Sequence, residues 1–226
     1  MSLKENYLNE MSLLKNERIE RVVEAAKVEF SLNGIKNSKL RVIAKRAKVG
    51  EASIYRYFKD KDDLIQVVGL SYWQNHLNSY EDFYYENVSE TDNGLKKIEI
   101  SLNIFHHLYD NHKDFLKFVE DYDNYYANDD INPSENSFKE IIFALRTRFV
   151  NDFNEGIKDG SINPKFNGEE KYTFVSPVMV STTQKLSAQV GKLNGYEVES
   201  AKKLISLLCL ASKKELGLKK STKSIK

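Results

Sequence analysis

The sequence contains little cysteine, proline or glycine and no long apolar run, and each shortage excludes a class of protein. Its 226 residues include one Cys, 3 Pro and 10 Gly. The single Cys209 cannot form an internal disulfide framework, which favours a reducing cytoplasm and a packing role for this thiol. No run of about 18 uncharged apolar residues occurs, and the N-terminus lacks the apolar core of a secretory signal. We therefore expect a cytoplasmic protein without a membrane partner.

The signatures of enzymes are missing as well. Glycine-rich phosphate loops and nucleophile elbows are absent. The adjacent His106 and His107 would point about 100° apart on a helix, and no cysteine partner or His-x-x-x-His spacing supports a shared metal ion. We expect no catalytic residue, no metal and no cofactor.

The sequence is instead rich in hydrophobic and charged residues. The chain is 41% hydrophobic and 30% charged, and it is long enough for one large or two small domains. This composition favours a predominantly helical fold.

Basic charge is concentrated in one segment. Between Gly34 and Lys61 nine basic and two acidic residues give a net charge of +7, which leaves −6 for the rest of a chain whose total is +1. A basic module on an acidic body predicts attraction to phosphate at one end of the molecule. A merely solvated charged face is the alternative.

Two short apolar patterns at helical spacing flank a tight turn in the same segment. The first ends at Ala47, the residues from Lys48 to Gly50 interrupt it, and the second ends at Phe58. This arrangement predicts a helix-turn-helix whose second helix, over residues 51–57, lies in the major groove of DNA. The apolar positions are Ile43, Ala44, Ala47, Val49, Ala52, Ile54, Tyr55 and Phe58.

This segment resembles the DNA-binding region of the TetR family of bacterial transcriptional regulators. The resemblance covers the first third of the chain and rests on Gly34, Ser38, Ile43-Ala44, Ala47 to Gly50, Ser53 to Phe58, Lys61-Asp62 and Leu64. It implies an all-α fold with an N-terminal three-helix helix-turn-helix domain and a larger C-terminal helical bundle for ligand binding and dimerisation. We place the first domain, with an N-terminal extension, at residues 1–63, the bundle at 64–218 and a basic, disordered tail at 219–226. Residues 1–16 are either frayed or helical.

The resemblance also assigns DNA contacts. It places Glu51, Ala52, Tyr55 and Arg41 where base edges are touched, which suits the guanidinium of Arg for guanine and apolar groups for the thymine methyl. Glu51 would accept from cytosine or reject other sequences. Core packing is the alternative role for Tyr55 and Tyr57. Phosphate contacts are implied for Ser53, Tyr57 and Lys61, and the predicted DNA-binding set is completed by Ser38, Lys39 and Arg56.

Three residues depart from the family pattern. Lys39 stands where a capping Thr is usual, so we expect Ser38 or Asn37 to cap the preceding helix. Lys48 replaces the turn glycine, and a left-handed residue with a side chain costs about 1–2 kcal/mol. Gly50 replaces a capping Ser at a cost of a few tenths of a kcal/mol.

Beyond residue 64 longer helical patterns follow. We expect helices over 64–87, 95–109, 114–126 and 134–156, a loop over 127–133 and a long connection over 156–168. Ser176-Pro177 indicates a helix N-cap followed by proline at the first helical position, although Pro177 could instead lie inside a helix that begins near Glu169.

The many aromatic residues between Trp73 and Phe153 predict a pocket for a small apolar or aromatic effector. Plain core packing is the alternative. The predicted ligand-binding residues are Trp73, Phe105, Tyr109, Phe118, Tyr122, Phe143, Met179 and Gln184.

Two late apolar stripes resemble the family's dimerisation hairpin, which forms a four-helix bundle with a second copy. The alternative is that the monomer core buries both faces. The predicted interface residues are Val178, Thr182, Leu186, Val190, Ala201, Leu204, Ile205 and Leu208.

Together these expectations describe a homodimeric transcriptional regulator, more specifically a repressor, that binds palindromic double-stranded operator DNA and is released by its effector. Two alternatives stay open. One is a regulator of the same fold that responds to a protein partner or to no ligand. The other is a helical enzyme or carrier with a vestigial DNA-binding module.

Overall fold

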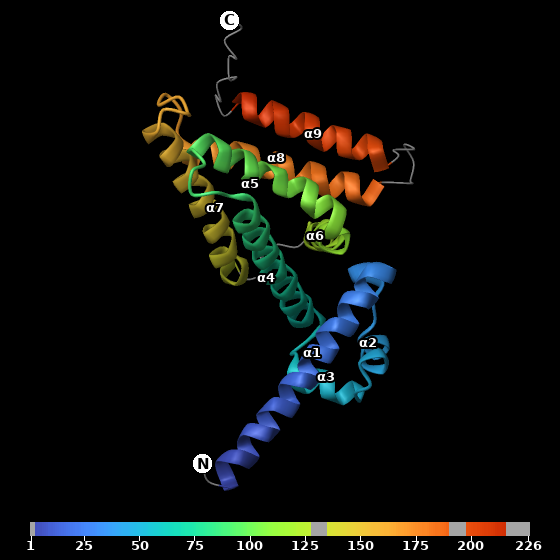
Figure 1. Cartoon of the computed structure of the whole chain (residues 1–226). Coiled ribbons are helices and arrows are strands. Elements are labelled where there is room, and N and C mark those ends of the chain that lie inside the picture. Colours follow the sequence, from blue (N-terminus) through green and yellow to red (C-terminus); the bar gives the residue numbers. More distant parts are fainter. Residues whose placement is uncertain (1–2, 128–134, 190–197, 216–226) are drawn as a thin grey trace, which may run out of the picture. The chain divides into compact units, whose positions relative to one another are not determined.

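The computed structural model describes residues 3–127, 135–189 and 198–215, and these residues form nine α-helices and no strand (Figure 1). The all-α prediction is confirmed. None of the described helices is both long enough and apolar enough to cross a bilayer. The chain divides into two units, unit 1 with Met1–Tyr72 and Asp121–Ser137, and unit 2 with Trp73–Glu120 and Phe138–Lys226. The predicted tail at 219–226 and most of the predicted 127–133 loop lie outside the described residues.

Unit 1 contains the helix-turn-helix. Helix α1 (Leu3–Asn37) packs on α2 (Leu40–Ala47), which packs on α3 (Glu51–Tyr57). Most of residues 1–16 belong to α1, which answers the question that the sequence left open. Regular helical dihedrals stop at Gly34 (φ 76°, ψ 157°), a positive φ that glycine adopts without a Cβ clash.

Two further helices supply residues to both units. Helix α4 (Lys61–Asn87) enters unit 2 at Trp73, and α6 (Lys113–Tyr126) enters unit 1 at Asp121. Within unit 1 the Asp121 carboxylate accepts a hydrogen bond from the backbone N–H of Ile35, just after the break in α1. Tyr122 donates its hydroxyl proton to Gln66 Oε1 on α4, with an O–O distance of 3.1 Å.

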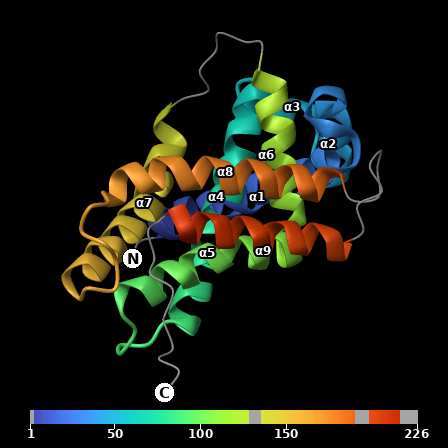
Figure 2. The same ribbon diagram turned by 90° about the horizontal axis from the view of Figure 1, so that it is seen from above.

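Unit 2 is built around three helices that lie side by side (Figures 1 and 2): α5 (Gly94–Asn111), α8 (Gly168–Gln189) and α9 (Val198–Glu215). Helix α7 (Glu135–Lys158) adds two phenylalanines to their shared core. The fully or nearly fully buried core residues are Ile98, Leu102, Tyr109, Phe149, Phe153, Ile162, Val175, Met179, Leu186, Ala201, Ile205 and Cys209. The packing role predicted for Cys209 is thereby confirmed, and its Sγ lies 3.5 Å from the Leu102 carbonyl oxygen.

The N-cap interpretation of Ser176-Pro177 is wrong, and its alternative is right. Helix α8 begins at Gly168 and carries Pro177 in its interior. Asn167 caps it, because its Oδ1 accepts from the Glu170 N–H at 3.1 Å. Both Thr173 and Pro177 are exposed, so water can solvate the carbonyl that the missing proline N–H leaves free.

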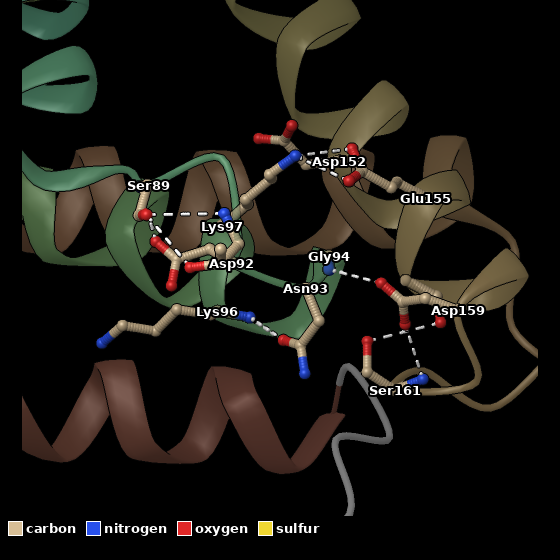
Figure 3. A network of polar contacts seen from close by, with 12 residues as sticks. Ser89, Asp92, Asn93, Gly94, Lys96, Lys97, Asp152, Glu155, Asp159 and Ser161 are labelled. Carbon is tan, nitrogen blue, oxygen red and sulfur yellow. Dashed lines mark hydrogen bonds and ion pairs between the residues drawn. The ribbon is translucent and has the colours of Figure 1, made fainter.

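The start of α5 and the end of α7 approach each other through glycine (Figure 3). The Gly94 N–H donates to Asp159 Oδ2 at 2.8 Å, and the Leu95 N–H donates to Ser161 Oγ at 3.1 Å. A Cβ on Gly94 would lie 2.0 Å from the backbone nitrogen of Gly156. Only glycine therefore permits this contact between the helices.

A buried carboxylate joins α4 to α7 beside this contact. Both oxygens of Asp152 accept the Tyr84 hydroxyl, at 2.9 and 3.0 Å, and the Arg148 guanidinium lies 4.8 Å from the centre of the Tyr84 ring. Burial raises the pKa of Asp152 to about 6, although the Tyr84 bond and Arg148 act in the opposite direction.

Substitution Asp152→Asn should change how stability depends on pH. Because the folded-state pKa lies above the ordinary 3.8, the folded state retains a proton that the unfolded chain loses, and stability falls as the pH rises from about 4 to about 6. Asn is uncharged and can still accept from Tyr84. We expect this loss to disappear and the free energy of unfolding at pH 7 to rise by about 1–2 kcal/mol, measured by urea titration at several pH values. The control Asp82→Asn, at an exposed α4 position, should retain the wild-type slope; the same slope in Asp152→Asn would contradict the assignment.

Candidate nucleic-acid interface and ligand cavity

The basic residues between Gly34 and Lys61 lie mostly on the surface of the helix-turn-helix. Arg46 forms an ion pair with Glu29 of α1 at 3.3 Å, and Lys61 is half-buried. The remaining basic side chains of the segment are exposed and bring positive charge to α2, α3 and the turns beside them. They are Lys36, Lys39, Arg41, Lys45, Lys48, Arg56 and Lys59.

The turn between α2 and α3 has the predicted backbone. Lys48 adopts the left-handed conformation at φ 55° and ψ 43°, and the Val49 N–H donates to the Ala44 carbonyl at 3.0 Å. Gly50 occupies the N-cap of α3 in extended conformation, and no side chain caps that end. The left-handed Lys48 and the N-cap position of Gly50 are thus as expected, and the free-energy costs of the two departures stay predictions.

The expectation that Ser38 or Asn37 caps α2 is wrong. The N-cap residue is Lys39, and no side chain bonds to that end of the helix. Ser38 is buried and donates instead to the Gly34 carbonyl at 2.7 Å or the Glu29 carbonyl at 3.2 Å. Regular helical geometry stops at Gly34, and the Ser38 hydroxyl therefore bonds to the end of α1 rather than to α2.

Helix α3 presents most of the predicted DNA-binding residues to solvent. Ile54 is buried, whereas Glu51, Ala52 and Arg56 are exposed and Tyr55 is 56% exposed, which excludes core packing in this chain for Tyr55. The half-buried pair of Ser53 and Tyr57 lies beside the Arg56 guanidinium, which donates to Ser53 Oγ at 3.0 Å and lies 5.6 Å from the Tyr57 ring centre.

Lys61 has a structural contact in addition to its predicted phosphate contact. Its ammonium donates to the Lys36 carbonyl at 3.2 Å, near the end of α1, and lies 5.7 Å from the centre of the Tyr125 ring. Partial burial lowers the pKa of Lys61. One of its three protons is thus engaged within unit 1.

Unit 2 contains a partly open cavity of about 190 Å³. Its wall comes from α4, α5, α6, α7 and α8 and is mainly apolar, with several polar side chains. The lining residues are Trp73, His76, Tyr80, Ser101, Leu102, Ile104, Phe105, Leu108, Phe115, Leu116, Val119, Ile142, Leu145, Phe149, Tyr172, Val175, Ser176, Val180 and Gln184.

The structure brings three of the predicted ligand-binding residues together in this wall: Trp73, Phe105 and Gln184. The other five do not line the cavity. Tyr109 and Met179 lie in the buried core, Phe118 is also buried, Tyr122 belongs to unit 1, and Phe143 is 65% exposed. Ligand binding by any of these eight residues stays a prediction.

The sequence reasoning overlooked several wall residues, among them His76, Phe115, Phe149 and Tyr172. One signal could have found His76, since it lies three residues after Trp73 and therefore on the same face of α4. The aromatic residues of the other helices gave no such signal, because spacing alone does not reveal which helices meet. Among the described residues, no group of three His, Cys, Asp or Glu side chains could hold a metal ion.

The residues predicted for dimerisation lie mostly inward. Leu186, Ala201 and Ile205 belong to the core of unit 2, and Leu204 and Leu208 pack against that core. Thr182 is half-buried, Val178 is exposed, and Val190 lies outside the described residues. The exposed apolar side chains of α8 and α9 are Phe174, Val178, Val198, Leu207 and Leu210.

The helix-turn-helix is the part of the chain that matches a known protein family. Residues 22–68 match the family described as bacterial regulatory proteins, tetR family. The N-terminal part of the chain is thus similar to that family. An HTH-type transcriptional regulator of Staphylococcus aureus (strain MRSA252) is 29% identical over 107 residues, which cover 46% of this chain and 54% of that protein. Another from S. aureus (strain USA300) is 34% identical over 74 residues, or 31% of this chain and 40% of its own length. The chain thus spans about half or less of these curated relatives.

Solved structures share the fold over most of the chain. The transcriptional regulator FadR from Bacillus subtilis, in complex with stearoyl-CoA, has a TM-score of 0.64 at 18% identity and covers 85% of this chain and 96% of its own. A tetR-family regulatory protein from Rhodococcus RHA1 has a TM-score of 0.64 at 14% identity, with 90% and 98% covered. The likeness in fold therefore extends beyond the helix-turn-helix to most of the chain.

Substitution Lys48→Gly should stabilise the protein. Removal of the side chain relieves a left-handed conformation that costs about 1–2 kcal/mol, and the greater flexibility of glycine in the unfolded chain offsets about half of this gain. We expect the free energy of unfolding to rise by about 0.5–1 kcal/mol in urea titrations. The control Lys45→Gly, inside α2, should instead lower it by about 1 kcal/mol. A destabilised Lys48→Gly variant would show that the Lys48 side chain stabilises the turn.

Proposed function

We propose that this chain is a homodimeric transcriptional regulator that binds a palindromic operator through α3 and releases it when the cavity of unit 2 takes up a small apolar or aromatic effector. The observation that carries the proposal is the exposed surface of the TetR-family helix-turn-helix, where basic side chains surround the outward residues of α3. Exposed lysine and arginine neutralise phosphate, and side chains of a short exposed helix can reach base edges.

The exposed residues divide into two roles. Arg41, Glu51, Ala52 and Tyr55 are proposed to face bases, because each is exposed on α2 or α3. Lys39, Arg56 and the hydroxyls of Ser53 and Tyr57 suit phosphate. The buried Ser38 positions the end of α1 and is proposed to act indirectly.

Helix α6 offers a route from the cavity to the DNA-binding unit. Its first half lines the cavity with Phe115, Leu116 and Val119, and its last turns bond to unit 1 through Asp121 and Tyr122. A ligand that displaces α6 would therefore act on the break in α1 and alter the separation of the two reading helices of a dimer. Such coupling is reciprocal, so operator DNA should weaken effector binding by the same factor, commonly 5- to 150-fold.

The effector is proposed to be compact. The B. subtilis FadR structure holds stearoyl-CoA, whose long acyl chain far exceeds a cavity of about 190 Å³. The apolar wall favours an apolar or aromatic molecule of limited size.

Two substitutions should separate base reading from phosphate attraction. We expect Arg41→Ala to reduce the preference for the palindrome upstream of the gene over a scrambled duplex by roughly 10- to 100-fold, because a base contact is lost. Lys39→Ala should weaken both duplexes equally and reduce the slope of log K against log salt by about 1. Fluorescence anisotropy over a salt series measures both effects.

The matched control is Lys96→Ala, at an exposed lysine of unit 2, which should leave affinity and slope unchanged. Equal affinity of the wild-type protein for upstream and scrambled duplexes would refute the proposal that this chain reads a sequence there.

The second copy is proposed to cover the exposed apolar side chains of α8 and α9. Leu207 and Leu210 of α9 are 60% and 63% exposed, and Phe174 and Val178 of α8 are exposed as well. Two copies are needed because palindromic half-sites are read about one DNA turn apart. An isologous pairing of this hairpin would supply them.

The double substitution Leu207→Glu with Leu210→Glu should convert the dimer to a monomer and abolish tight operator binding, because two charges would be buried at the interface. Light scattering after size exclusion gives the mass. The control Phe143→Glu, at a phenylalanine of α7 with 65% exposure, should remain dimeric. A dimer that survives the double substitution would place the interface elsewhere.

A further inference from the structure

His76 has a buried ring nitrogen without a partner, and its side chain belongs to the cavity wall. The side chain lies on α4, is 8% exposed and lines the cavity. Its Nδ1 is fully buried and has no hydrogen-bond partner. The ring stacks on Phe115 at 4.7 Å between centroids and meets the edge of Trp73 at 5.8 Å, so its position is fixed by packing. A buried polar atom left unpaired is costly, and a ligand that pairs with it recovers that cost.

Two other polar groups of the wall already have partners. The Tyr80 hydroxyl and Ser101 Oγ lie 3.1 Å apart and are hydrogen-bonded to each other. These groups have less to gain from a ligand than His76 does. Among the described wall residues, Gln184 included, His76 is the one with a fully buried side-chain nitrogen or oxygen that has no partner, so we take the imidazole as the polar group to which a ligand would be directed.

The wall contains no Asp, Glu, Lys or Arg among its described lining residues. His76 is itself uncharged at neutral pH, because burial, with smaller contributions from His112 and His107, lowers its pKa to about 4. His107 and His112 face Ser79 Oγ at 3.1 and 2.8 Å and do not line the cavity. A charged ligand would thus lose its hydration without a countercharge, which excludes carboxylates and amines on energetic grounds.

Size and shape restrict the ligand further. A dry cavity of about 150 Å³ in another protein accommodates benzene, so about 190 Å³ corresponds to one aromatic ring with a small substituent. Trp73, Phe105, Phe115 and Phe149 supply aromatic faces and edges around this volume. Aromatic pairs in offset or edge-to-face contact favour a planar ring here.

We propose that the cavity binds an uncharged, single-ring aromatic compound with one hydroxyl or carbonyl group, and that this group forms a hydrogen bond with the His76 imidazole. The inference deepens the proposed function, since it names the class of effector, and rests on it for the biological purpose of the site. His76 then decides which ring compounds are accepted, because an unsubstituted ring leaves its nitrogen unpaired.

The test compares three probes of similar shape: 4-ethylphenol, ethylbenzene and the anion of 4-ethylbenzoic acid. Trp73 is the only tryptophan of the chain and lies in the wall, so its fluorescence, excited beyond the absorption of phenol, reports binding. We expect 4-ethylphenol to bind roughly 3- to 10-fold more tightly than ethylbenzene. The anion should bind more weakly than either.

In His76→Phe the preference for 4-ethylphenol over ethylbenzene should disappear while ethylbenzene still binds. The matched control is His106→Phe, at a histidine outside the cavity whose Nε2 lies 3.3 Å from Ser206 Oγ, and it should retain the preference. A measurement on the unaltered protein avoids any folding defect of the variant: the ring ¹⁵N resonances of His76 should shift with 4-ethylphenol and not with ethylbenzene.

Equal binding of the two neutral probes, tightest binding of the anion, no binding of any probe, or unshifted His76 resonances would each overturn the proposal. All these measurements use the protein without DNA. A chain that binds 4-ethylphenol through His76 but does not bind the upstream DNA specifically would support this inference and refute the proposed regulator. A chain that binds the upstream DNA specifically but does not bind 4-ethylphenol through His76 would support the regulator and refute this inference.

Discussion

The break in α1 at Gly34 is the constraint on which the DNA-binding unit depends. A positive φ there interrupts the helix, and three side chains satisfy the backbone groups it exposes: Ser38 bonds to the Gly34 carbonyl, Lys61 to the Lys36 carbonyl and Asp121 to the Ile35 N–H. These side chains come from the segment before α2, from the start of α4 and from α6. One local departure from helical geometry therefore fixes the junction of four helices, because each unsatisfied backbone group would cost about 1–3 kcal/mol if buried.

Local chemistry made this unit largely predictable from the sequence. Helical spacing predicted the span of α3, whereas the resemblance to the TetR pattern implied the left-handed Lys48 and the N-cap position of Gly50, and the structure has all three. The role of Ser38 did not follow in this way. Its hydroxyl could bond either to the start of α2 or to the end of α1, and it bonds to the end of α1. That outcome depends on the dihedral angles of Gly34, which glycine permits but which the sequence does not specify.

For the larger unit, the sequence predicted the helices well but predicted less well which residues line the cavity. Periodicity indicates which side of a helix is apolar, yet Tyr109 and Met179 on such faces fill the core, whereas Trp73 and Phe105 line the cavity. The difference arises from which helices meet, and no local pattern contains it. His76 illustrates the same limit, because its place in the cavity wall depends on packing against Phe115 of another helix.

The cavity also affects the folding stability of the protein, and through it the rate at which the protein is degraded. The apolar side chains around this space lack packing partners on the side that faces it, and such incomplete packing lowers the stability of a domain. A molecule that fills the space adds stability in proportion to the logarithm of its concentration, and it lowers the fraction of unfolded chains that proteases can degrade. If the effector proposed above binds there, the cellular amount of this protein would rise with the concentration of that effector.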